Sequence, residues 1–390
     1  MKQAQVISLG CRLNIAESER IRSLVAHDNV VVINSCAVTT EAVRQTRQAI
    51  RKARKARPDA RLLVTGCAAD IEREQLSAMP EVDGLIANEA KLDARAWNVP
   101  EPASSAPPKH TRAFIAVQNG CDHACTFCVI PQGRGQSRSL TIAQVLGEVE
   151  RHVMQGSSEV VLTGVDVTSW GHDLPETPPL GELVQAVLHS FPQMQRLRMS
   201  SLDGIEIDPL LFELFASEDR LMPHLHLSLQ HGADLILKRM KRRHSRADAV
   251  DIVSRLKKRR PELAIGADLI AGFPTETEEH HQANLSIIEE LDLVHGHIFP
   301  YSPRPGTPAA RMPQHDRALI KQRAAELRAK VAERRANWLQ SLVGKPQSVL
   351  SESDGAGYSP SFARIAVPEG TPKGSIVTVT PQACENGLLL

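Results

Sequence analysis

The chain has 390 residues, enough for two or three domains with substantial cores. Its 46 Lys and Arg nearly balance 45 Asp and Glu, and its hydrophobic content of 42% is typical of globular proteins. The sequence contains neither an apolar run long enough to span a membrane nor a signal-peptide pattern at its N-terminus. We therefore expect a soluble, cytoplasmic protein with no membrane partner.

Cysteine is the residue type that most needs an explanation. The seven cysteines are at positions 11, 36, 67, 121, 125, 128 and 384. Structural disulfides are rare in a reducing compartment, and an odd number without a secretion signal argues against a disulfide framework. Metal binding or catalysis explains most of them better. Cys384 has no neighbouring cysteine, and we expect it to be structural.

Residues 1–97 alternate between strand-like and helical patterns. Short β-branched runs predict strands at 5–9, 30–34 and 61–65, and residues 41–56 are typical of a helix. Strands that alternate with helices indicate an α/β domain with a parallel sheet.

Each predicted strand of this domain is followed directly by a cysteine, namely Cys11, Cys36 and Cys67. Ligand sites form at the carboxyl ends of parallel strands, so we expect the three thiols to converge on one shared ligand. The alternative is that each cysteine is a small buried hydrophobic residue.

The rest of the chain suggests three further segments. Residues 98–111 are rich in Pro and Ser, which indicates a linker. Residues 112–342 predict a partial barrel of six β/α steps that ends in a long basic helix over 318–342, and residues 343–390 predict a small all-β module. The six barrel strands are expected at 113–118, 159–163, 196–200, 224–228, 265–270 and 293–299.

A C-x-x-x-C-x-x-C loop follows the first barrel strand and contains Cys121, Cys125 and Cys128. Three thiolates at this spacing can hold three irons of a 4Fe–4S cluster and leave the fourth iron open for another ligand. The alternative is zinc, which usually takes paired knuckles and a fourth ligand that His123 supplies only awkwardly.

With Phe127 directly before its last cysteine, this loop resembles that of the radical S-adenosylmethionine (SAM) superfamily. Stretches beginning at Leu9, Asn34, Thr65, Leu162, His224, Gly272 and Pro300 resemble the methylthiotransferases within it. The resemblance implies an N-terminal α/β methylthiotransferase domain, a radical SAM partial (β/α)6 barrel and a C-terminal RNA-binding β-barrel of the TRAM type.

The resemblance also implies two 4Fe–4S clusters and SAM as cofactors. Cys121, Cys125 and Cys128 are expected to hold the cluster that cleaves SAM, and Cys11, Cys36 and Cys67 the cluster that presents sulfur. The residues expected to face SAM or the substrate are Phe127, Thr163, Gly164, Asp166, Ser200, Ser201 and Gln230. An electron donor of the flavodoxin or ferredoxin type is implied, and the sulfur source stays open.

Local charge favours RNA as the substrate. The segment 44–57 carries seven positive charges and no acid, and further basic clusters lie at 238–243 and 257–260. Such stripes are typical of nucleic-acid binding, although any one can be an ordinary solvated face. The candidate RNA-binding residues are Arg44, Arg47, Arg51 and Arg54. With few aromatics available, we expect phosphate contacts to dominate and the target base to leave its stack.

Four histidines lie in predicted strands or helices, and the sequence indicates no metal or catalytic partner for them. We expect His224 and His226, which alternate along a strand, to be partly buried and satisfied. We expect His280 and His281 to be solvated on a helix surface.

Within the family, Ala37-Val38-Thr39 and the basic stretch 44–47 resemble the branch that acts on N6-threonylcarbamoyladenosine beside the tRNA anticodon. The implied activity is transfer of a methylthio group to carbon 2 of that adenine. The alternatives are isopentenyladenosine in tRNA, an aspartate of a ribosomal protein, or a non-catalytic RNA-binding protein with zinc in its cysteine sites.

Overall fold

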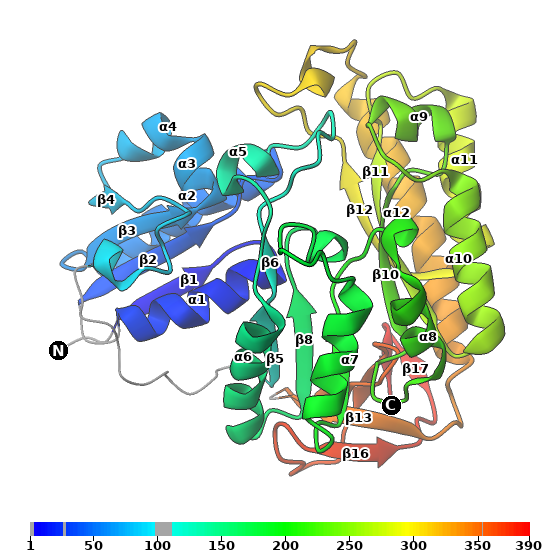
Figure 1. Cartoon of the computed structure of the whole chain (residues 1–390). Coiled ribbons are helices and arrows are strands. Elements are labelled where there is room, and N and C mark those ends of the chain that lie inside the picture. Colours follow the sequence, from blue (N-terminus) through cyan, green and yellow to red (C-terminus); the bar gives the residue numbers. More distant parts are fainter. Residues whose placement is uncertain (1–3, 26–28, 98–110, 353) are drawn as a thin grey trace.

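The computed structural model describes residues 4–25, 29–97, 111–352 and 354–390 (Figure 1). We call the described residues up to 97 the N-terminal unit, 111–342 the barrel unit, and those from 343 the C-terminal unit. Apart from Thr111, the predicted linker lies outside the described residues. Within the described ranges, no helix has the length and apolar character needed to cross a membrane.

The N-terminal unit is built on a parallel sheet in the order β1-β2-β3-β4. The strands are β1 (Gln5–Ser8), β2 (Val30–Ser35), β3 (Arg61–Gly66) and β4 (Gly84–Leu85). The helices are α1 (Arg12–Leu24), α2 (Thr40–Ala56), α3 (Cys67–Ile71), α4 (Arg73–Ser77) and the short 3₁₀ turn η1 (Ala94–Trp97). The three predicted strands and the predicted helix are confirmed, and β4 adds a fourth strand.

The helix α2 shows why this segment folds as predicted. Thr39 caps its start by accepting a hydrogen bond from the backbone N–H of Ala42. Val43, Ile50 and Ala53 are buried at helical spacing against the sheet. The remaining positions carry the basic side chains.

The barrel unit has six parallel strands in two groups, β5-β8-β9 and β10-β11-β12, joined through bridges such as Leu202 to Leu227. The strands are β5 (Arg112–Ala116), β8 (Glu159–Thr163), β9 (Arg196–Met199), β10 (His224–Gln230), β11 (Ala264–Ala271) and β12 (Leu293–Pro300). A small antiparallel pair is formed by β6 (Gln118–Asn119) and β7 (Arg138–Ser139). All six predicted barrel strands are confirmed, with ends shifted by at most two residues.

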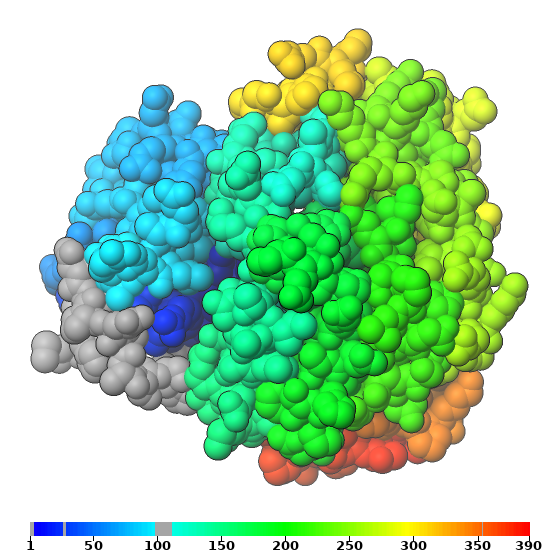
Figure 2. Space-filling view, in the orientation of Figure 1, coloured from blue at the N-terminus to red at the C-terminus, as the bar shows by residue number. Residues whose placement is uncertain are grey.

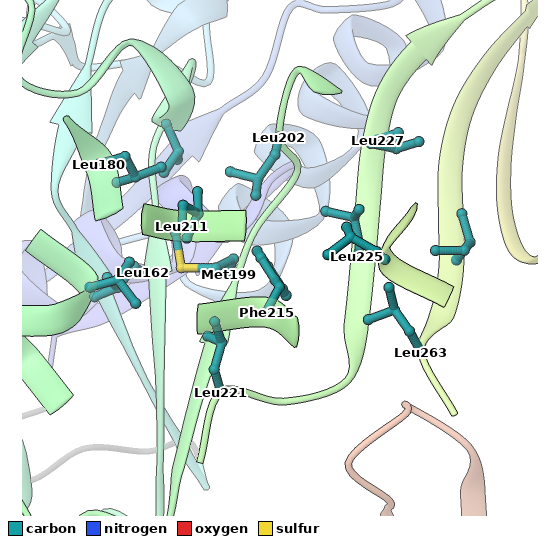
Figure 3. Packing of buried hydrophobic residues seen from close by; sticks show 14 of the residues in the cluster. Leu162, Leu180, Met199, Leu202, Leu211, Phe215, Leu221, Leu225, Leu227 and Leu263 are labelled. Atoms are coloured by element: carbon teal, nitrogen blue, oxygen red, sulfur yellow. The ribbon is translucent and has the colours of Figure 1, made fainter. Parts of the chain in front are cut away.

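Helices cover the outside of these strands. They are α5 (Ile130–Arg134), α6 (Ile142–Met154), α7 (Leu180–Ser190), α8 (Pro209–Ser217), α9 (Asp234–Arg239), α10 (Arg246–Arg259), α11 (Glu278–Glu290) and α12 (Arg317–Gln340), with 3₁₀ turns η2 (Val167–Ser169), η3 (Gly204–Glu206) and η4 (Pro308–Arg311). The predicted basic helix is α12. The core between strands and helices is aliphatic, as Figure 3 shows for Leu162, Met199 and Leu225 of the strands near Leu211 and Phe215 of α8.

The opposite faces of the same strands are polar. Leu225 and Leu227 of β10 point to the helices, whereas His224 and His226 alternate with them. The other strands also carry charged residues on the inner face, among them Asp268 of β11. The interior of the barrel is therefore a polar surface.

The C-terminal unit is a sheet of six short strands in the order β16-β13-β14-β15-β18-β17. The strands are β13 (Gln347–Ser351), β14 (Ala356–Tyr358), β15 (Arg364–Ala366), β16 (Ile376–Val379), β17 (Cys384–Glu385) and β18 (Leu388–Leu389). The predicted all-β module is confirmed. Cys384 packs half-buried against the core of this unit.

The C-terminal unit covers the amino ends of the barrel strands. In Figure 1 the arrowhead of β8 points away from it, and Figure 2 shows the unit beneath the barrel with the N-terminal unit against the barrel's side. Arg196 of β9 donates hydrogen bonds to the carbonyl oxygens of Ser348 and Tyr358. The carboxyl ends of the strands thus stay available for a site.

One sequence prediction about the surface is wrong. His281 is 1% exposed, and its imidazole lies between the carboxylates of Glu276 and Glu326. Helix α12 packs against α11 and covers it, which the local sequence does not reveal.

Candidate active site between the N-terminal and barrel units

The loop that carries Cys121, Cys125 and Cys128 lies at the carboxyl end of the barrel strands. All three cysteines are free of disulfides. The backbone N–H of His123 donates to Sγ of Cys121 at 3.4 Å, and that of Ile130 donates to Sγ of Cys128 at 3.4 Å. Hydrogen bonds to sulfur are a feature of iron–sulfur sites, so the loop fits a 4Fe–4S cluster.

Two thiols of this loop, Cys121 and Cys128, stay protonated at neutral pH unless a metal binds them. Burial, together with the charges of neighbouring thiols, raises the pKa of Cys121 to about 12 and that of Cys128 to about 11. Such thiols are poor free nucleophiles, but a coordinated metal deprotonates a thiol outright. The guanidinium of Arg242 donates to Sγ of Cys125 at 3.6 Å and brings a positive charge to the site.

Asp166, one of the residues expected to face SAM, lies beside the cysteine loop. Its Oδ2 lies 2.7 Å from Nε2 of His123 and accepts a hydrogen bond from Ser169 at 2.7 Å. The ligating atoms of Cys121, His123 and Asp166 lie within 4.8 Å of one another. The hydrogen bond to Asp166 raises the pKa of His123 and favours the charged imidazolium beside the carboxylate.

The turn before Asp166 depends on a glycine. A Cβ at Gly164 would lie 2.8 Å from the carbonyl oxygen of Gln118. The side chain of Gln118 accepts hydrogen bonds from the N–H groups of Val165 and Asp166, which holds this turn over the loop. Thr163, the last residue of β8, is buried beneath it.

The other predicted residues lie at neighbouring strand ends. Ser200 follows β9 and is buried, and its hydroxyl has no hydrogen-bond partner among the described residues, while Ser201 is half-buried. Gln230 ends β10 with a left-handed backbone, φ 70°. Phe127 points to the aromatic group around Phe273, with ring centroids 6.5 Å apart.

Cys11, Cys36 and Cys67 converge at the carboxyl edge of the N-terminal sheet, as their positions after β1, β2 and β3 predicted. Burial, together with the neighbouring thiols of Cys67 and Cys11, raises the pKa of Cys36 to about 11. Gly10, with φ 97°, allows the close packing, because a Cβ there would lie 2.9 Å from Sγ of Cys36. These three thiols are also free of disulfides.

A buried ionic network beside these thiols was missed by the sequence reasoning. Arg134 of α5 donates to Oε1 of Glu17 at 2.9 Å and to Oδ1 of Asn14 at 2.6 Å. Nζ of Lys91 lies 2.5 Å from Oε2 of Glu17. Arg134 and Lys91 both oppose the burial that raises the pKa of Cys67, so the site offsets negative charge on its sulfurs.

The two groups of thiols lie on either side of the junction of the units. Helix α3, which begins at Cys67, packs against α5, and a Cβ at Gly133 would lie 3.4 Å from that of Cys67. Cys67 is also among the groups whose charge acts on Cys128. A substrate at this junction would meet both.

The basic cluster 238–243 was expected to form an exposed surface, but two of its arginines are engaged inside the protein. The guanidinium of Arg242 is 9% exposed and binds Asp203 at 2.7 Å, which in turn binds His244 at 3.1 Å. Arg239 donates to the hydroxyl of Thr275. These two arginines therefore build the site instead of facing solvent.

The four candidate RNA-binding arginines of α2 are not equivalent. Arg54 binds Asp83 at 2.5 Å and the carbonyl oxygens of Pro58, Ala60 and Glu81, so its role is structural. Arg47 lies 3.3 Å from Glu72. Arg44 and Arg51, with side chains 60% and 64% exposed, are the two that face solvent.

Comparison with known proteins agrees with this arrangement. Residues 115–286 match the model of the radical SAM superfamily, and residues 3–87 match an uncharacterized protein family, UPF0004. A threonylcarbamoyladenosine tRNA methylthiotransferase, MtaB, of Rickettsia prowazekii is 43% identical over 99% of this chain and 96% of its own length. The MtaB of Thermotoga maritima is 32% identical over 90% of this chain and 87% of its own.

The chain belongs to the radical SAM methylthiotransferase family. A second kind of relative is a tRNA-2-methylthio-N6-dimethylallyladenosine synthase of Ehrlichia chaffeensis, 31% identical over 90% of this chain and 88% of its own length. The solved radical SAM methyltransferase TsrM of Kitasatospora setae shares the fold, with a TM-score of 0.52 and 16% identity over 76% of this methylthiotransferase and 68% of that chain.

Proposed function

We propose that this methylthiotransferase adds a methylthio group to carbon 2 of N6-threonylcarbamoyladenosine next to the anticodon of tRNA. The observation that carries the proposal is the pair of thiol groups on either side of the junction, one on each unit. The names of the MtaB relatives supply the substrate. The C–H bond at carbon 2 is unactivated, so acid–base side chains alone are not suited to break it.

In this proposal Cys121, Cys125 and Cys128 hold one 4Fe–4S cluster together with SAM, and Cys11, Cys36 and Cys67 hold the second cluster. When bound, these groups supply the radical and the sulfur, while the protein supplies orientation and protection from side reactions. An electron donor of the flavodoxin or ferredoxin type delivers the reducing electrons.

The chain's own residues then have positioning roles. Asp166, held by His123 and Ser169, places a carboxylate beside Cys121. Gly164 and Thr163 shape the same strand end, and Ser200, Ser201 and Gln230 form the neighbouring ends that face SAM and the adenine. Phe127 anchors the loop on the aromatic group around Phe273.

Three domains follow from the same proposal: residues 1–97, 112–342 and 343–390, with 98–111 as linker. The C-terminal domain and the exposed Arg44 and Arg51 bind the tRNA backbone, and the target base leaves its stack to reach the junction. The enzyme acts in the cytoplasm.

The test is direct assay of the reconstituted protein. Purified full-length enzyme with SAM and a reductant is incubated with anticodon stem-loop RNAs that carry either threonylcarbamoyladenosine or isopentenyladenosine. Mass spectrometry should detect the methylthio product from the first RNA and little from the second. Product from the isopentenyl RNA alone would contradict the proposal, and zinc instead of iron in the purified protein would favour the non-catalytic alternative.

A further inference from the structure

One arginine inside the barrel stands apart from the others. Arg12 is the first residue of α1, which packs along the edge strand β5. Its Cζ lies 5.7 Å from the ring centroid of Phe362, a residue of the C-terminal unit. The guanidinium groups of Arg112 and Arg198 lie over the same ring, at 5.3 and 4.2 Å.

The other guanidinium groups in this region have carboxylate partners. Arg112 and Arg198 bind Glu159 at 2.8 and 3.0 Å, and Arg112 also binds Glu352 at 3.0 Å. Arg12, by contrast, forms no ion pair or hydrogen bond through its guanidinium with any described residue. The guanidinium of Arg12 therefore has no carboxylate in direct contact, and Glu159 and Asp268 act on its charge only from a distance.

The inner face of the barrel near Arg12 is polar. His226 and His297 both bind Oδ1 of Asp268, at 3.1 and 3.0 Å, and Asp268 is near enough to Arg12 to act on its charge. The side chain of His297 is 63% exposed although it lies on the inner face of β12. This histidine of the polar wall is therefore accessible to a ligand group.

The position of Arg12 relates it to the substrate. Arg12 directly follows Cys11, one of the thiols proposed to hold the sulfur-presenting cluster. In adenine, carbon 2 and carbon 6 flank N1, so the group on N6 lies at the same edge of the ring as carbon 2. A base whose carbon 2 faces Cys11, Cys36 and Cys67 can therefore extend its long N6 group into the barrel toward Arg12, the residue that follows Cys11.

We infer that Arg12 binds the carboxylate of the threonylcarbamoyl group, with His297 and Asp268 as the polar wall beside it. This inference rests on the proposed function, and it assigns recognition of the modified adenosine to Arg12. A guanidinium matches a carboxylate in charge and in hydrogen-bond geometry. An isopentenyl group has no charge and gains nothing from such a site.

Two other sources of an anion fit less well. An RNA phosphate belongs to a backbone that stays outside while a flipped base enters the barrel. The carboxylate of SAM, by the family resemblance, belongs at the loop of Cys121, Cys125 and Cys128. The experiment below distinguishes the threonylcarbamoyl carboxylate, an RNA phosphate and the SAM carboxylate as the anion that Arg12 binds.

The experiment compares two stem-loop RNAs, one with threonylcarbamoyladenosine and one in which its carboxylate is a methyl ester. The reconstituted full-length enzyme is tested as wild type, Arg12→Gln and Arg12→Lys. Arg20→Gln is the matched control, because Arg20 lies exposed on the same helix. KM and kcat for the RNA, KM for SAM, iron content and affinity for the unmodified stem-loop are measured.

We expect the wild type to prefer the carboxylate RNA over the ester in KM by about tenfold or more. Arg12→Gln should lose this preference by binding the carboxylate RNA as weakly as the ester, and Arg12→Lys should keep part of it. KM for SAM and affinity for the unmodified RNA should not change. Arg20→Gln should behave as the wild type.

Several outcomes would overturn the inference. One is a wild-type enzyme with the same KM for the carboxylate RNA and the ester RNA. Another is an Arg12→Gln enzyme that keeps the full preference for the carboxylate RNA. A third is an Arg12→Gln enzyme in which only KM for SAM or affinity for the unmodified RNA is impaired. If Arg12→Gln loses iron, the inference is still tested by the KM values of the wild type and of Arg12→Lys for the carboxylate RNA and the ester RNA. A wild type that makes product from neither RNA, but from isopentenyladenosine, would instead refute the proposed function.

Discussion

Arg134 of the barrel unit and Glu17 of the N-terminal unit form a salt bridge of 2.9 Å in which both side chains are at most 2% exposed. The bridge lies beside the three thiols of the N-terminal unit and joins the two elements that carry the cysteine groups. Lys91 binds the second oxygen of the same carboxylate. This buried carboxylate therefore helps to fix the relative position of the two proposed clusters.

Glu17→Gln should destabilise the protein by about 3–5 kcal/mol, because two buried cations then lack their partner. Unfolding in denaturant measures this loss, and iron content should fall with it. The double variant Glu17→Gln, Lys91→Met should recover part of the stability, since one of the two cations is gone. Arg95→Gln, which breaks an exposed pair with Asp93, serves as the control and should have no measurable effect. Equal stability of Glu17→Gln and the control would show that the network is not what joins the units.

Cys121→Ala combined with Cys125→Ala should reduce iron from about eight to about four atoms per chain after anaerobic reconstitution. The reason is that Cys11, Cys36 and Cys67 belong to the N-terminal unit and are untouched by these changes. Iron analysis with absorption spectroscopy measures the result. Cys384→Ala is the matched control and should keep all the iron. A double variant without iron would mean that Cys11, Cys36 and Cys67 hold no cluster of their own.

Replacing Cys11, Cys36 and Cys67 together by Ala should leave reductive cleavage of SAM intact and abolish the methylthio product. The barrel loop keeps its own thiols and hydrogen bonds, so its cluster should still form. Chromatography of 5′-deoxyadenosine and mass spectrometry of the RNA measure the two reactions. Normal amounts of methylthio product from this variant would show that the three cysteines are only structural.

Arg44→Gln with Arg51→Gln should weaken tRNA binding and lower its dependence on salt. Each arginine that no longer neutralises a phosphate should reduce the slope of log affinity against log salt by about 0.7–0.9. Affinity measured at several salt concentrations gives the slope. Arg255→Gln on α10, also an exposed arginine paired within its helix, is the control. Identical slopes for both variants would place the RNA-binding surface elsewhere, for example on the C-terminal unit.

His295→Gln should make stability less sensitive to acid. Burial, followed by the nearby Arg335, lowers the pKa of His295 to about 3, whereas an unfolded chain protonates histidine near pH 6.5. Between these values the unfolded state binds more protons, so the free energy of unfolding falls as pH falls, by up to about 1.4 kcal/mol per pH unit. The variant should lose this slope between pH 6 and pH 5 in denaturant titrations. The exposed His189→Gln on α7 is the control, and a variant slope equal to that of the wild type would contradict the prediction.

Much of the site could be predicted because it depends on local order along the chain. Strands β1, β2 and β3 are recognisable from their apolar β-branched runs, and Cys11, Cys36 and Cys67 follow them directly. The carboxyl ends of parallel strands share one edge, so convergence of the thiols needs no knowledge of side-chain packing. The same holds for the loop of Cys121, Cys125 and Cys128, whose spacing is local.

Only the tertiary structure decided which charged side chains are buried and which residues they pair with. In the sequence, Arg54, Arg242 and His281 cannot be distinguished from solvated residues. In the structure each has an acidic partner from another element, which is Asp83 for Arg54, Asp203 for Arg242 and Glu326 for His281. Glu17, Lys91 and Arg134 are far apart along the chain and follow no spacing rule. Strand and helix patterns record the burial of apolar side chains at fixed intervals, whereas an ion pair depends on how separate units dock. The sequence by itself therefore determined the elements and the two cysteine groups, and docking of the units decided the ionic network between them and the position of Arg12 in the barrel.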